Sequence, residues 1–187
     1  MDISRLEEKK ISSRLIYDGQ VVHLYVDEIE LPDGKHATRE YVRHTGAVCV
    51  VPLTEQGEVI CVRQYRYPFG RVMLEIPAGK LDSKEEDPTS AALRELREET
   101  GAHCESLIFL GEYYPSVAIL DENIRMFLAT GLSFGSLDLD EDEFLQVERV
   151  PLSELVERIM SGEICDGKTQ VAILKVWKLL QEQEEKI

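Results

Sequence analysis

The sequence has few basic residues and no long hydrophobic run, and both shortages exclude classes of partner. Its 21 lysines and arginines stand against 36 aspartates and glutamates, which gives a formal net charge of −15. Such a charge repels nucleic acid and anionic membranes, and no basic stripe offsets it. No segment is apolar for long enough to span a bilayer, and the N-terminal stretch MDISRLEEKK lacks the apolar core of a secretion signal. We therefore expect neither a nucleic-acid nor a membrane partner, and no secretion.

Cysteine is also scarce, and its spacing argues against a metal or disulfide framework. The four cysteines form no CxxC pair, and two of them lie in apolar runs, where cysteine behaves as a small hydrophobic residue. They are Cys49, Cys61, Cys104 and Cys165. We expect reduced thiols, no zinc site and a cytoplasmic protein.

The order of the remaining patterns predicts the fold class. Turn signals at Asp18-Gly19 and Pro32-Asp33-Gly34 divide the N-terminal part into two or three strands. Farther on, strands are expected at 46–53, 59–66, 72–77, 106–114, 123–130 and 144–150, and helices at 88–100, 152–161 and 169–185. Strands on both sides of one central helix, with two helices at the end, predict a mixed α/β or α+β sandwich.

The central helix, 88–100, carries an unusual concentration of acid. On a helical wheel three glutamates share an arc about 100° wide, an apolar stripe adjoins it, and two arginines fall on the remaining side. The glutamates are Glu95, Glu98 and Glu99, the stripe is Ala92, Leu93 and Leu96, and the arginines are Arg94 and Arg97. Like charges three and four residues apart cost about 0.2–0.5 kcal/mol per pair. A solvated surface would explain such a face, and so would a divalent cation bound to the carboxylates.

The surrounding stretch, PAGKLDSKEEDPTSAALRELREETGA, decides between these two explanations. It resembles the signature of the Nudix hydrolases, which consists of a glycine, an isolated glutamate and then Arg-Glu-hydrophobic-x-Glu-Glu-x-Gly. The matching positions are Gly79, Glu86, Arg94, Glu95, Leu96, Glu98, Glu99 and Gly101. The gap from Gly79 to Glu86 is one residue longer than usual, in a loop that tolerates insertion, and this leaves Glu85 as an alternative to Glu86.

The resemblance implies a fold, a reaction and a metal site. The fold would be an α/β/α sandwich with a mixed central sheet and an N-terminal antiparallel strand segment. The reaction would be hydrolysis of a nucleoside diphosphate linked to another group, with Mg²⁺ or Mn²⁺. The implied roles are metal binding by Glu95, Glu99 and the Ala78 carbonyl, a further ligand or supporting acid at Glu98, and a structural pairing of Arg94 with Glu86.

Three segments outside the signature are similar to the ADP-ribose pyrophosphatase branch of this family. They are LPDGKHATREYVRHTGAVCVVPL, VRQYRYPFGRVMLEIPAGKL and DGKTQVAILKVW. The similarity implies that Arg43 and Arg66 hold the substrate phosphates, since a guanidinium gives bidentate hydrogen bonds. It also implies that Glu75 faces the substrate or the metal. Otherwise the arginines are strand-edge or surface charges, and Glu75 an outward strand residue.

An acidic run, DLDEDE at 138–143, precedes the last expected strand. Without context it would be a solvated loop, but the resemblance implies that a glutamate here activates the attacking water. Glu143 is the best match, and Glu141 is the second.

One segment, YYPSVAILDEN at 113–123, departs from the branch. The branch has Ser-Pro-Gly, whereas this chain has Pro115-Ser116 and no following glycine, although Glu122 matches a family glutamate. The altered loop would contact the distal sugar, so ADP-glucose, GDP-mannose or a dinucleotide are alternative substrates. Tyr17 or Tyr25 would stack on the base if they are not strand core.

The resemblance also predicts domain organisation and assembly. Residues 1–45 would be a strand-rich segment that reaches across a homodimer, and residues 46–187 the Nudix hydrolase domain. A non-catalytic ligand sensor and a structural acidic protein are the competing classes. The complete set of motif glutamates favours an enzyme over both.

Overall fold

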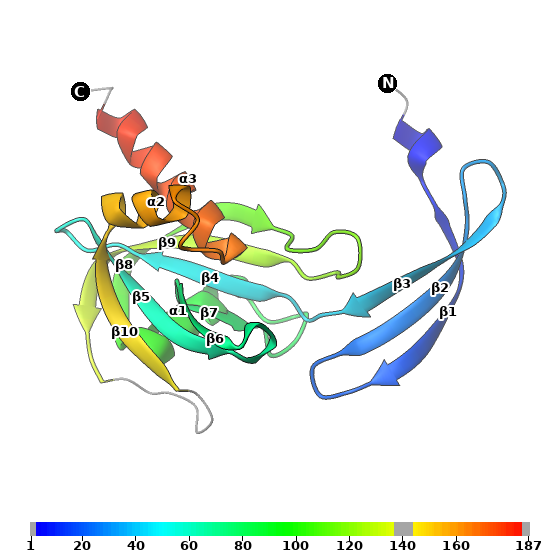
Figure 1. The fold of residues 1–187 in the computed structure, drawn as a ribbon, viewed down its shortest axis with the longest axis horizontal. Helices are drawn as coiled ribbons and strands as arrows, with labels where there is room; N and C mark the ends of the chain where they lie inside the picture. Colours follow the sequence, from blue (N-terminus) through cyan, green and yellow to red (C-terminus); the bar gives the residue numbers. More distant parts are fainter. Residues whose placement is uncertain (1–2, 137–143, 185–187) are drawn as a thin grey trace. The chain divides into compact units, whose positions relative to one another are not determined.

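The computed structural model describes residues 3–136 and 144–184, which form an α+β fold of two compact units (Figure 1). The N-terminal unit comprises residues 1–45 and 114–122, and the main unit comprises residues 46–113 and 123–187.

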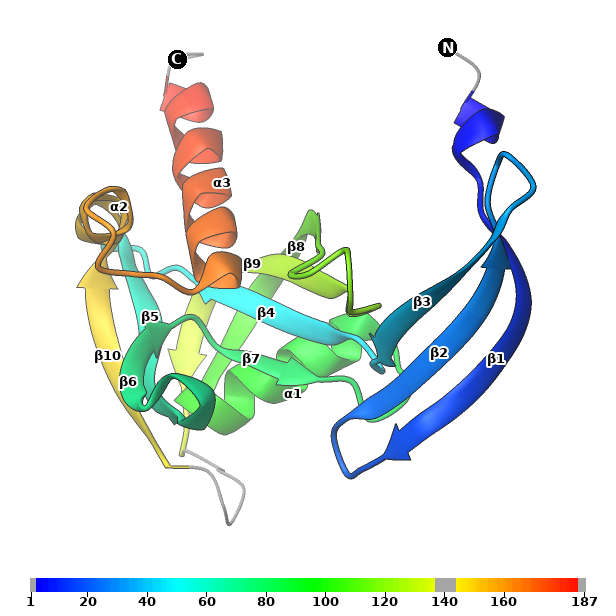
Figure 2. The same cartoon turned by 45° about the vertical axis from the view of Figure 1, so that its right-hand side comes forward.

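The N-terminal unit is an antiparallel sheet in the order β1-β2-β3 (Figure 2). A short 3-10 turn, η1 (Ile3–Leu6), precedes β1 (Lys9–Asp18), β2 (His23–Glu30) and β3 (His36–Arg43). The end of β3 is held by the segment 114–122, since the Val42 amide donates to the Ile119 carbonyl at 2.8 Å.

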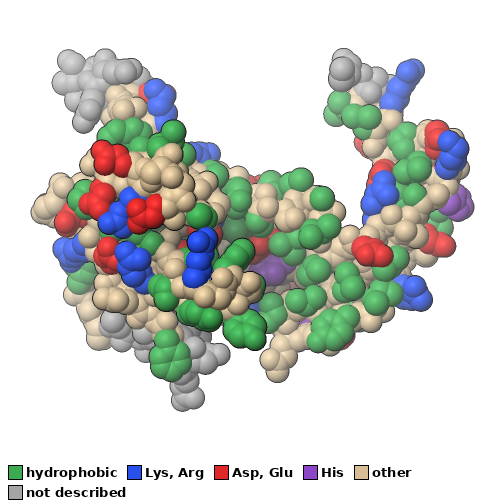
Figure 3. All heavy atoms as spheres, viewed as in Figure 1, with side chains coloured by type: hydrophobic (Ala, Val, Ile, Leu, Met, Phe, Trp, Pro, Cys, Tyr) green, Lys and Arg blue, Asp and Glu red, His purple; other side chains and the backbone are tan. Residues whose placement is uncertain are grey.

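This sheet has almost no buried interior. Every residue of β1 is exposed, and within the described part of the unit only Asp27 and Ile29 are buried. Figure 3 shows hydrophobic side chains, in green, over the surface of this unit. The exposed large hydrophobic residues of its first hairpin are Ile11, Leu15, Ile16, Tyr17, Val21 and Val22. A sheet of this size gains stability only when such a surface is covered.

The main unit contains two sheets and three α-helices in its described residues. Its strands are β4 (Ala47–Pro52), β5 (Glu58–Arg66), β6 (Arg71–Glu75), β7 (Ala78–Lys80), β8 (Ala102–Tyr113), β9 (Ile124–Phe134) and β10 (Leu145–Pro151). Its helices are α1 (Pro88–Thr100), α2 (Leu152–Met160) and α3 (Gly167–Glu184), with a 3-10 turn η2 (Tyr67–Phe69). The sheet orders are β7-β4-β9-β8 and β10-β5-β6.

The larger sheet lies between helices, which confirms the predicted α/β/α sandwich. Successive residues of β4 point to opposite faces: Val48 and Val50 pack with α1, whereas Cys49 and Val51 belong to the core under α2 and α3. The sheet is mixed, because β4 is parallel to β9 and antiparallel to β7. In the described residues no helix is long and apolar enough to cross a membrane.

Helix α1 begins and ends where the sequence predicts. The Asp87 carboxylate accepts from the Ser90 amide at 2.9 Å, Pro88 occupies the first turn, and Gly101 ends the helix with φ 68°. The predicted apolar stripe is wrong at one position, since Leu93 is 42% exposed. Ala91, beside Ala92 and Leu96, is buried instead.

A second correction concerns the strand predicted at 72–77. Strand β6 ends at Glu75, and Ala78–Lys80 forms the separate strand β7, which pairs with β4. The Pro77-Ala78-Gly79 stretch therefore leads directly into an element of the larger sheet, and the backbone of Ala78 is fixed opposite Cys49.

Candidate active site

Two glutamates of α1 lie buried against the backbone of β7. Glu95 is 8% exposed and Glu99 is 2% exposed. The Ala78 amide donates to Glu99 Oε2 at 3.1 Å. A Cβ at Gly79 would lie 2.0 Å from Glu95 Oε1, so only glycine leaves room for that carboxylate. The motif glycine and the two glutamates therefore form one closely fitted arrangement.

Arg94 supplies positive charge to this arrangement. Its Nη1 donates to Glu95 Oε1 at 2.7 Å and to Glu98 Oε2 at 3.2 Å, and its Nη2 lies 3.4 Å from Glu86 Oε1. Burial alone would lower the pKa of Arg94, but Glu95 and Glu98 outweigh it and the pKa is raised. The pairing of Arg94 with Glu86 that the resemblance implies is present, and the same guanidinium also contacts Glu95 and Glu98.

The loop before α1 is closed by Glu86, the residue that contacts Arg94. The Asp82 amide donates to Glu86 Oε2 at 2.6 Å. Glu98 differs from the buried pair, since it also accepts from Arg97 Nη2 at 3.1 Å and is partly exposed. We call these residues the α1 cluster; its members are Glu86, Arg94, Glu95, Arg97, Glu98 and Glu99.

The donor set of the α1 cluster fits a hard divalent cation. Glu95 and Glu99 present carboxylate oxygens at the Ala78–Gly79 backbone, and oxygen ligands are those that Mg²⁺ and Mn²⁺ prefer. Within residues 3–136 and 144–184, no three His, Cys, Asp or Glu side chains are grouped closely enough to form a complete metal site. The ligand roles of Glu95, Glu99, Ala78 and Glu98 stay predictions.

A second charged group joins β5, β6 and the start of α3. Arg66 Nε and Nη2 donate to the two carboxylate oxygens of Glu75, each at 2.7 Å. Lys168 also donates to Glu75 Oε2, and to Asp166 Oδ2 at 3.0 Å. The sequence left open whether Glu75 faces the substrate or metal, or points outward from its strand. Glu75 is 2% exposed, so it is not an outward strand residue. We call Arg66, Glu75, Asp166 and Lys168 the Glu75 cluster.

The surroundings shift the pKa of Glu75, Lys168 and Arg66 towards the charged form of each side chain. Burial alone would raise the pKa of Glu75, but hydrogen bonds from Arg66 and the charge of Lys168 bring it below its usual value. Burial likewise opposes the charge of Lys168, yet Asp166 and Glu75 raise its pKa. Hydrogen bonding to Glu75 raises the pKa of Arg66, to which the charge of Glu99 also contributes. Arg66 therefore lies within electrostatic reach of the α1 cluster.

Two predicted substrate residues belong to the N-terminal unit. The Arg43 guanidinium lies 4.2 Å from the ring centroid of Tyr25, which stacks on Tyr41 at 5.8 Å. Next to Arg43, His44 Nδ1 lies 3.6 Å from Glu122 Oε1. Within this unit, Glu122 therefore lies beside the residue that follows Arg43, where the altered segment 114–122 joins the end of β3. Tyr17 is largely exposed and Tyr25 is partly buried.

Comparison with known proteins agrees with the motif. Residues 43–166 match the model of the NUDIX domain, which is more than half of the chain. The chain belongs to the Nudix family. Residues 8–42 of this Nudix protein match a second model, described as the nucleoside diphosphate sugar hydrolase N-terminal domain.

Relatives of this Nudix protein cover nearly its whole length. It is 44% identical to an ADP-ribose pyrophosphatase of Bacillus subtilis over 183 residues, which are 96% of this chain and 98% of that protein. It is also 44% identical to a methanol dehydrogenase activator of Bacillus methanolicus, over 89% of this chain and 91% of that protein. The crystal structure of an ADP compounds hydrolase matches with a TM-score of 0.84, covering 95% of this chain and 96% of that chain at 23% identity, which shows the shared fold.

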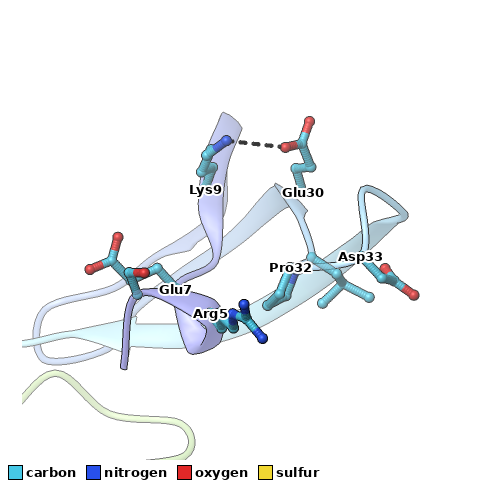
Figure 4. Close-up of a pocket in the computed structure, with 8 residues that line it drawn as sticks. Arg5, Glu7, Lys9, Glu30, Pro32 and Asp33 are labelled. Carbon is cyan, nitrogen blue, oxygen red and sulfur yellow. Dashed lines mark hydrogen bonds and ion pairs between the residues drawn. The ribbon is translucent and has the colours of Figure 1, made fainter. Parts of the chain in front are cut away.

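Glu141 and Glu143 lie outside the described residues. A pocket of about 570 Å³ lies within the N-terminal unit, with Lys9 and Glu30 paired at its edge (Figure 4). Its lining contains none of the predicted site residues, so it does not carry the chemistry.

Sequence reasoning missed Lys168 and Asp166. Both lie in the segment DGKTQVAILKVW, which was singled out only as a whole. The available signal was an aspartate placed before an apolar helical pattern, which is an N-cap, followed by a lysine in the first turn of a helix that packs in the core.

Proposed function

We propose that this Nudix hydrolase cleaves the pyrophosphate bond of ADP-ribose to AMP and ribose 5-phosphate, with Mg²⁺ or Mn²⁺ as cofactor. The burial of Glu95 and Glu99 against the Ala78–Gly79 backbone is the observation that carries the proposal. The 44% identity to an ADP-ribose pyrophosphatase over 183 residues supports this substrate.

In this proposal the residues of the α1 cluster hold and orient the metal. Glu95, Glu99 and the Ala78 carbonyl are its ligands, and Glu98 is a further ligand or a supporting acid. When bound, the ion neutralises pyrophosphate charge and lowers the pKa of a bound water. Arg94 fixes the Glu95 carboxylate and, through Glu86, the preceding loop.

The proposed substrate contacts are those that the family resemblance implies. Arg66 and Arg43 hold phosphate oxygens, and Glu75 orients Arg66. Glu122 and the altered segment 114–122 face the distal sugar, so this segment sets which nucleoside diphosphate sugar is preferred. Glu143, or as second candidate Glu141, activates the attacking water as an ionised base.

A substrate panel tests the proposal. The protein is incubated in Mg²⁺, and separately in Mn²⁺, with ADP-ribose, ADP-glucose, GDP-mannose, NADH and diadenosine polyphosphates, and the products are resolved by chromatography. We expect AMP and ribose 5-phosphate, with the highest kcat/KM for ADP-ribose. Preference for another nucleoside diphosphate sugar would support the proposed reaction and indicate that segment 114–122 determines a different specificity. If no compound is hydrolysed, a ligand sensor would be favoured.

The water-activating residue is tested by two substitutions. We expect Glu143→Gln to lower kcat by about 100-fold or more with little change in KM, because a general base contributes about 10²–10⁴-fold. Loss of activity in Glu141→Gln, together with a normal Glu143→Gln enzyme, would transfer the role to Glu141.

A second candidate function is activation of a dehydrogenase. The observation that favours it is the 44% identity to a methanol dehydrogenase activator, which equals the identity to the pyrophosphatase. Addition of this protein to a methanol dehydrogenase, with and without Mg²⁺, tests it. A rise in dehydrogenase rate that Glu99→Gln abolishes would mean that the same site serves both functions.

We further propose that the protein is a cytoplasmic homodimer in which residues 1–45 form the dimerisation segment and residues 46–187 the hydrolase domain. The exposed hydrophobic residues of the β1–β2 hairpin support the dimer, and the free thiols of Cys49 and Cys61 support a reducing compartment. Sedimentation equilibrium should give a dimer for the native protein and a monomer for Leu15→Glu, with Arg14→Glu as control.

A further inference from the structure

The start of α3 is attached to the end of β6 at two consecutive residues. The Ile76 amide donates to Thr169 Oγ1 at 3.0 Å, and Thr169 is fully buried. The residues that precede these two in the chain are also paired, since Lys168 donates to Glu75 Oε2. Asp166 completes the attachment as the helix cap, since its Oδ2 accepts from the Thr169 amide at 3.0 Å. The first turn of α3 thus forms a fixed support behind Glu75.

Glu75 is the link between this support and Arg66. Its Oε2 accepts from both Lys168 and Arg66 Nη2, the latter at 2.7 Å, while Oε1 accepts from Arg66 Nε at 2.7 Å. The pair fixes the plane of the guanidinium and leaves Nη1 outside the carboxylate contact. The side chain of Glu75 is 2% exposed, that of Lys168 is 11% exposed and that of Arg66 is 38% exposed. Of the three, only Arg66 has a large part of its side chain accessible to a ligand.

The charges explain why a lysine lies behind this carboxylate. Arg66 and Lys168 are balanced by Glu75 and Asp166, so the buried part of the cluster is neutral as a whole. If Lys168 were neutral, Glu75 would depend on Arg66 alone, and its two oxygens would compete with an anionic substrate for the guanidinium. With Lys168 sharing Oε2, Glu75 fixes Arg66 while leaving it more positive charge for a phosphate.

We propose that Lys168 is a positioning residue for phosphate binding, which acts through Glu75 to fix the Arg66 guanidinium; this inference rests on the proposed function. Lys168 does not itself touch the substrate. It sets the orientation and the effective charge of Arg66, and the rigid first turn of α3 transmits that position from the helical layer to the strands β5 and β6.

A double-mutant cycle tests the proposal. Lys168→Met, Arg66→Ala and the double variant are compared with the native protein by the KM and kcat for ADP-ribose in Mg²⁺ and by calorimetric titration with ADP in EDTA, where no hydrolysis occurs. We expect Lys168→Met to raise KM and the ADP Kd by about 10-fold while kcat changes by less than about threefold, since a charge-assisted hydrogen bond is weakened in binding. In the Arg66→Ala background, Lys168→Met should cause no further loss.

Two results would overturn the proposal. One is an unchanged KM and ADP affinity in Lys168→Met. The other is a loss in the double variant equal to the product of the two single losses, because Lys168 would then act independently of Arg66. If the native protein neither hydrolyses the substrate panel nor binds ADP, the proposed function itself is wrong. If the native protein turns over normally and Lys168→Met has the same KM and ADP affinity, only the positioning role of Lys168 is wrong.

Matched variants separate positioning from folding. Lys178→Met removes another α3 lysine, which is exposed and paired with Glu182 at 3.5 Å, and should leave KM, kcat and ADP affinity unchanged. Lys168→Arg restores the positive charge and should bring KM closer to the native value than Lys168→Met does. If Lys168→Met is unfolded by circular dichroism, the comparison of Lys168→Arg with Lys168→Gln at 10 °C replaces it, and equal KM values in those two would contradict the proposal.

Discussion

The main unit contains two charged clusters, one of six residues and one of four, which differ in their balance of charge. The α1 cluster has four glutamates and two arginines, whereas the Glu75 cluster has two acids and two bases. The first has an excess of carboxylates close to a strand backbone, which suits a divalent cation. The second is neutral within itself and holds an arginine in one orientation. The proposed metal site is therefore the cluster with excess negative charge, and the neutral Glu75 cluster supports the phosphate-binding arginine.

Removal of one carboxylate from the α1 cluster should have the largest effect. We expect Glu99→Gln to lower kcat for ADP-ribose by more than about 1,000-fold, because a metal supplies several kcal/mol of transition-state stabilisation and Glu99 is one of its proposed ligands. The fold should be retained, since the carboxamide oxygen of the substituted side chain can still accept a hydrogen bond from the Ala78 backbone amide. The rate of AMP formation is measured at saturating Mg²⁺, and the affinity for Mg²⁺ is measured by calorimetry.

The control for this substitution is Glu154→Gln, which neutralises a carboxylate paired with Arg158 on α2. It should leave kcat within about twofold of the native value, because exposed ion pairs contribute about 0–1 kcal/mol. A Glu99→Gln enzyme with a near-native rate and near-native Mg²⁺ dependence would show that the α1 cluster does not hold the metal through Glu99. The contrast between the two clusters would then be wrong.

Removal of the central acid of the Glu75 cluster should lower the stability of the protein as well as its affinity for phosphate. Glu75→Gln leaves Lys168 with one acidic partner, and breaking such a buried pair costs about 3 kcal/mol at pH 7. The pKa of Glu75 is lowered in the folded protein, so its contribution is complete above the unfolded pKa of about 4.3 and is lost as pH falls through the folded value. Urea unfolding of both proteins between pH 7 and pH 3 measures this difference.

The expected signature is a stability gap between native protein and variant that is constant from pH 7 to about pH 5 and narrows below about pH 4. A gap that stays constant down to pH 3 would mean that Glu75 is stabilising by its shape and hydrogen bonds. In that case the neutral balance of the Glu75 cluster would not explain its role.

Local patterns predicted the fold and the α1 motif because their causes are local. The Asp87-Pro88 start and the Gly101 end fix α1, and the continuous apolar run of β4 predicts a buried strand. The motif spacing identified Gly79, Glu95 and Glu99, which the structure brings together through one helix and the adjacent short strand. The family assignment followed from these residues.

Contacts between distant segments explain what the sequence did not predict. Lys168 and Glu75 are separated by 93 positions, and no periodicity connects a helix start with the end of a strand. The contacts of Arg94 with Glu95 and Glu98 were not predicted, because a helical wheel locates Cα atoms and does not give the reach of a long guanidinium side chain. Leu93 was misplaced because Ala91 and Ala92 occupy the face nearest the sheet.

The close approach within the α1 cluster can be tested at Gly79. Gly79→Ala would place a methyl group on the Glu95 carboxylate, which Arg94 holds in position, so the carboxylate must shift. We expect kcat/KM to fall by about 10–100-fold, since a displacement of about 1 Å in a catalytic group has effects of that order. Gly135→Ala is the matched control, because its new Cβ would meet no atom closer than 3.8 Å. Equal activity of the two variants would show that Glu95 does not need its present position.

The smallest expected effect compares the caps of the two helices. Asp87 and Asp166 both accept from a backbone amide three residues ahead, at 2.9 Å in α1 and 3.0 Å in α3. Asp87→Ala should cost about 1 kcal/mol of unfolding free energy and leave KM unchanged, since Asp87 serves only the helix start. Asp166→Ala removes a cap of the same kind and also a partner of Lys168, so it should raise KM as well. If both variants lose only stability, the first turn of α3 acts as an ordinary helix start, and the contrast between the two clusters would rest on Glu75 and Arg66 alone.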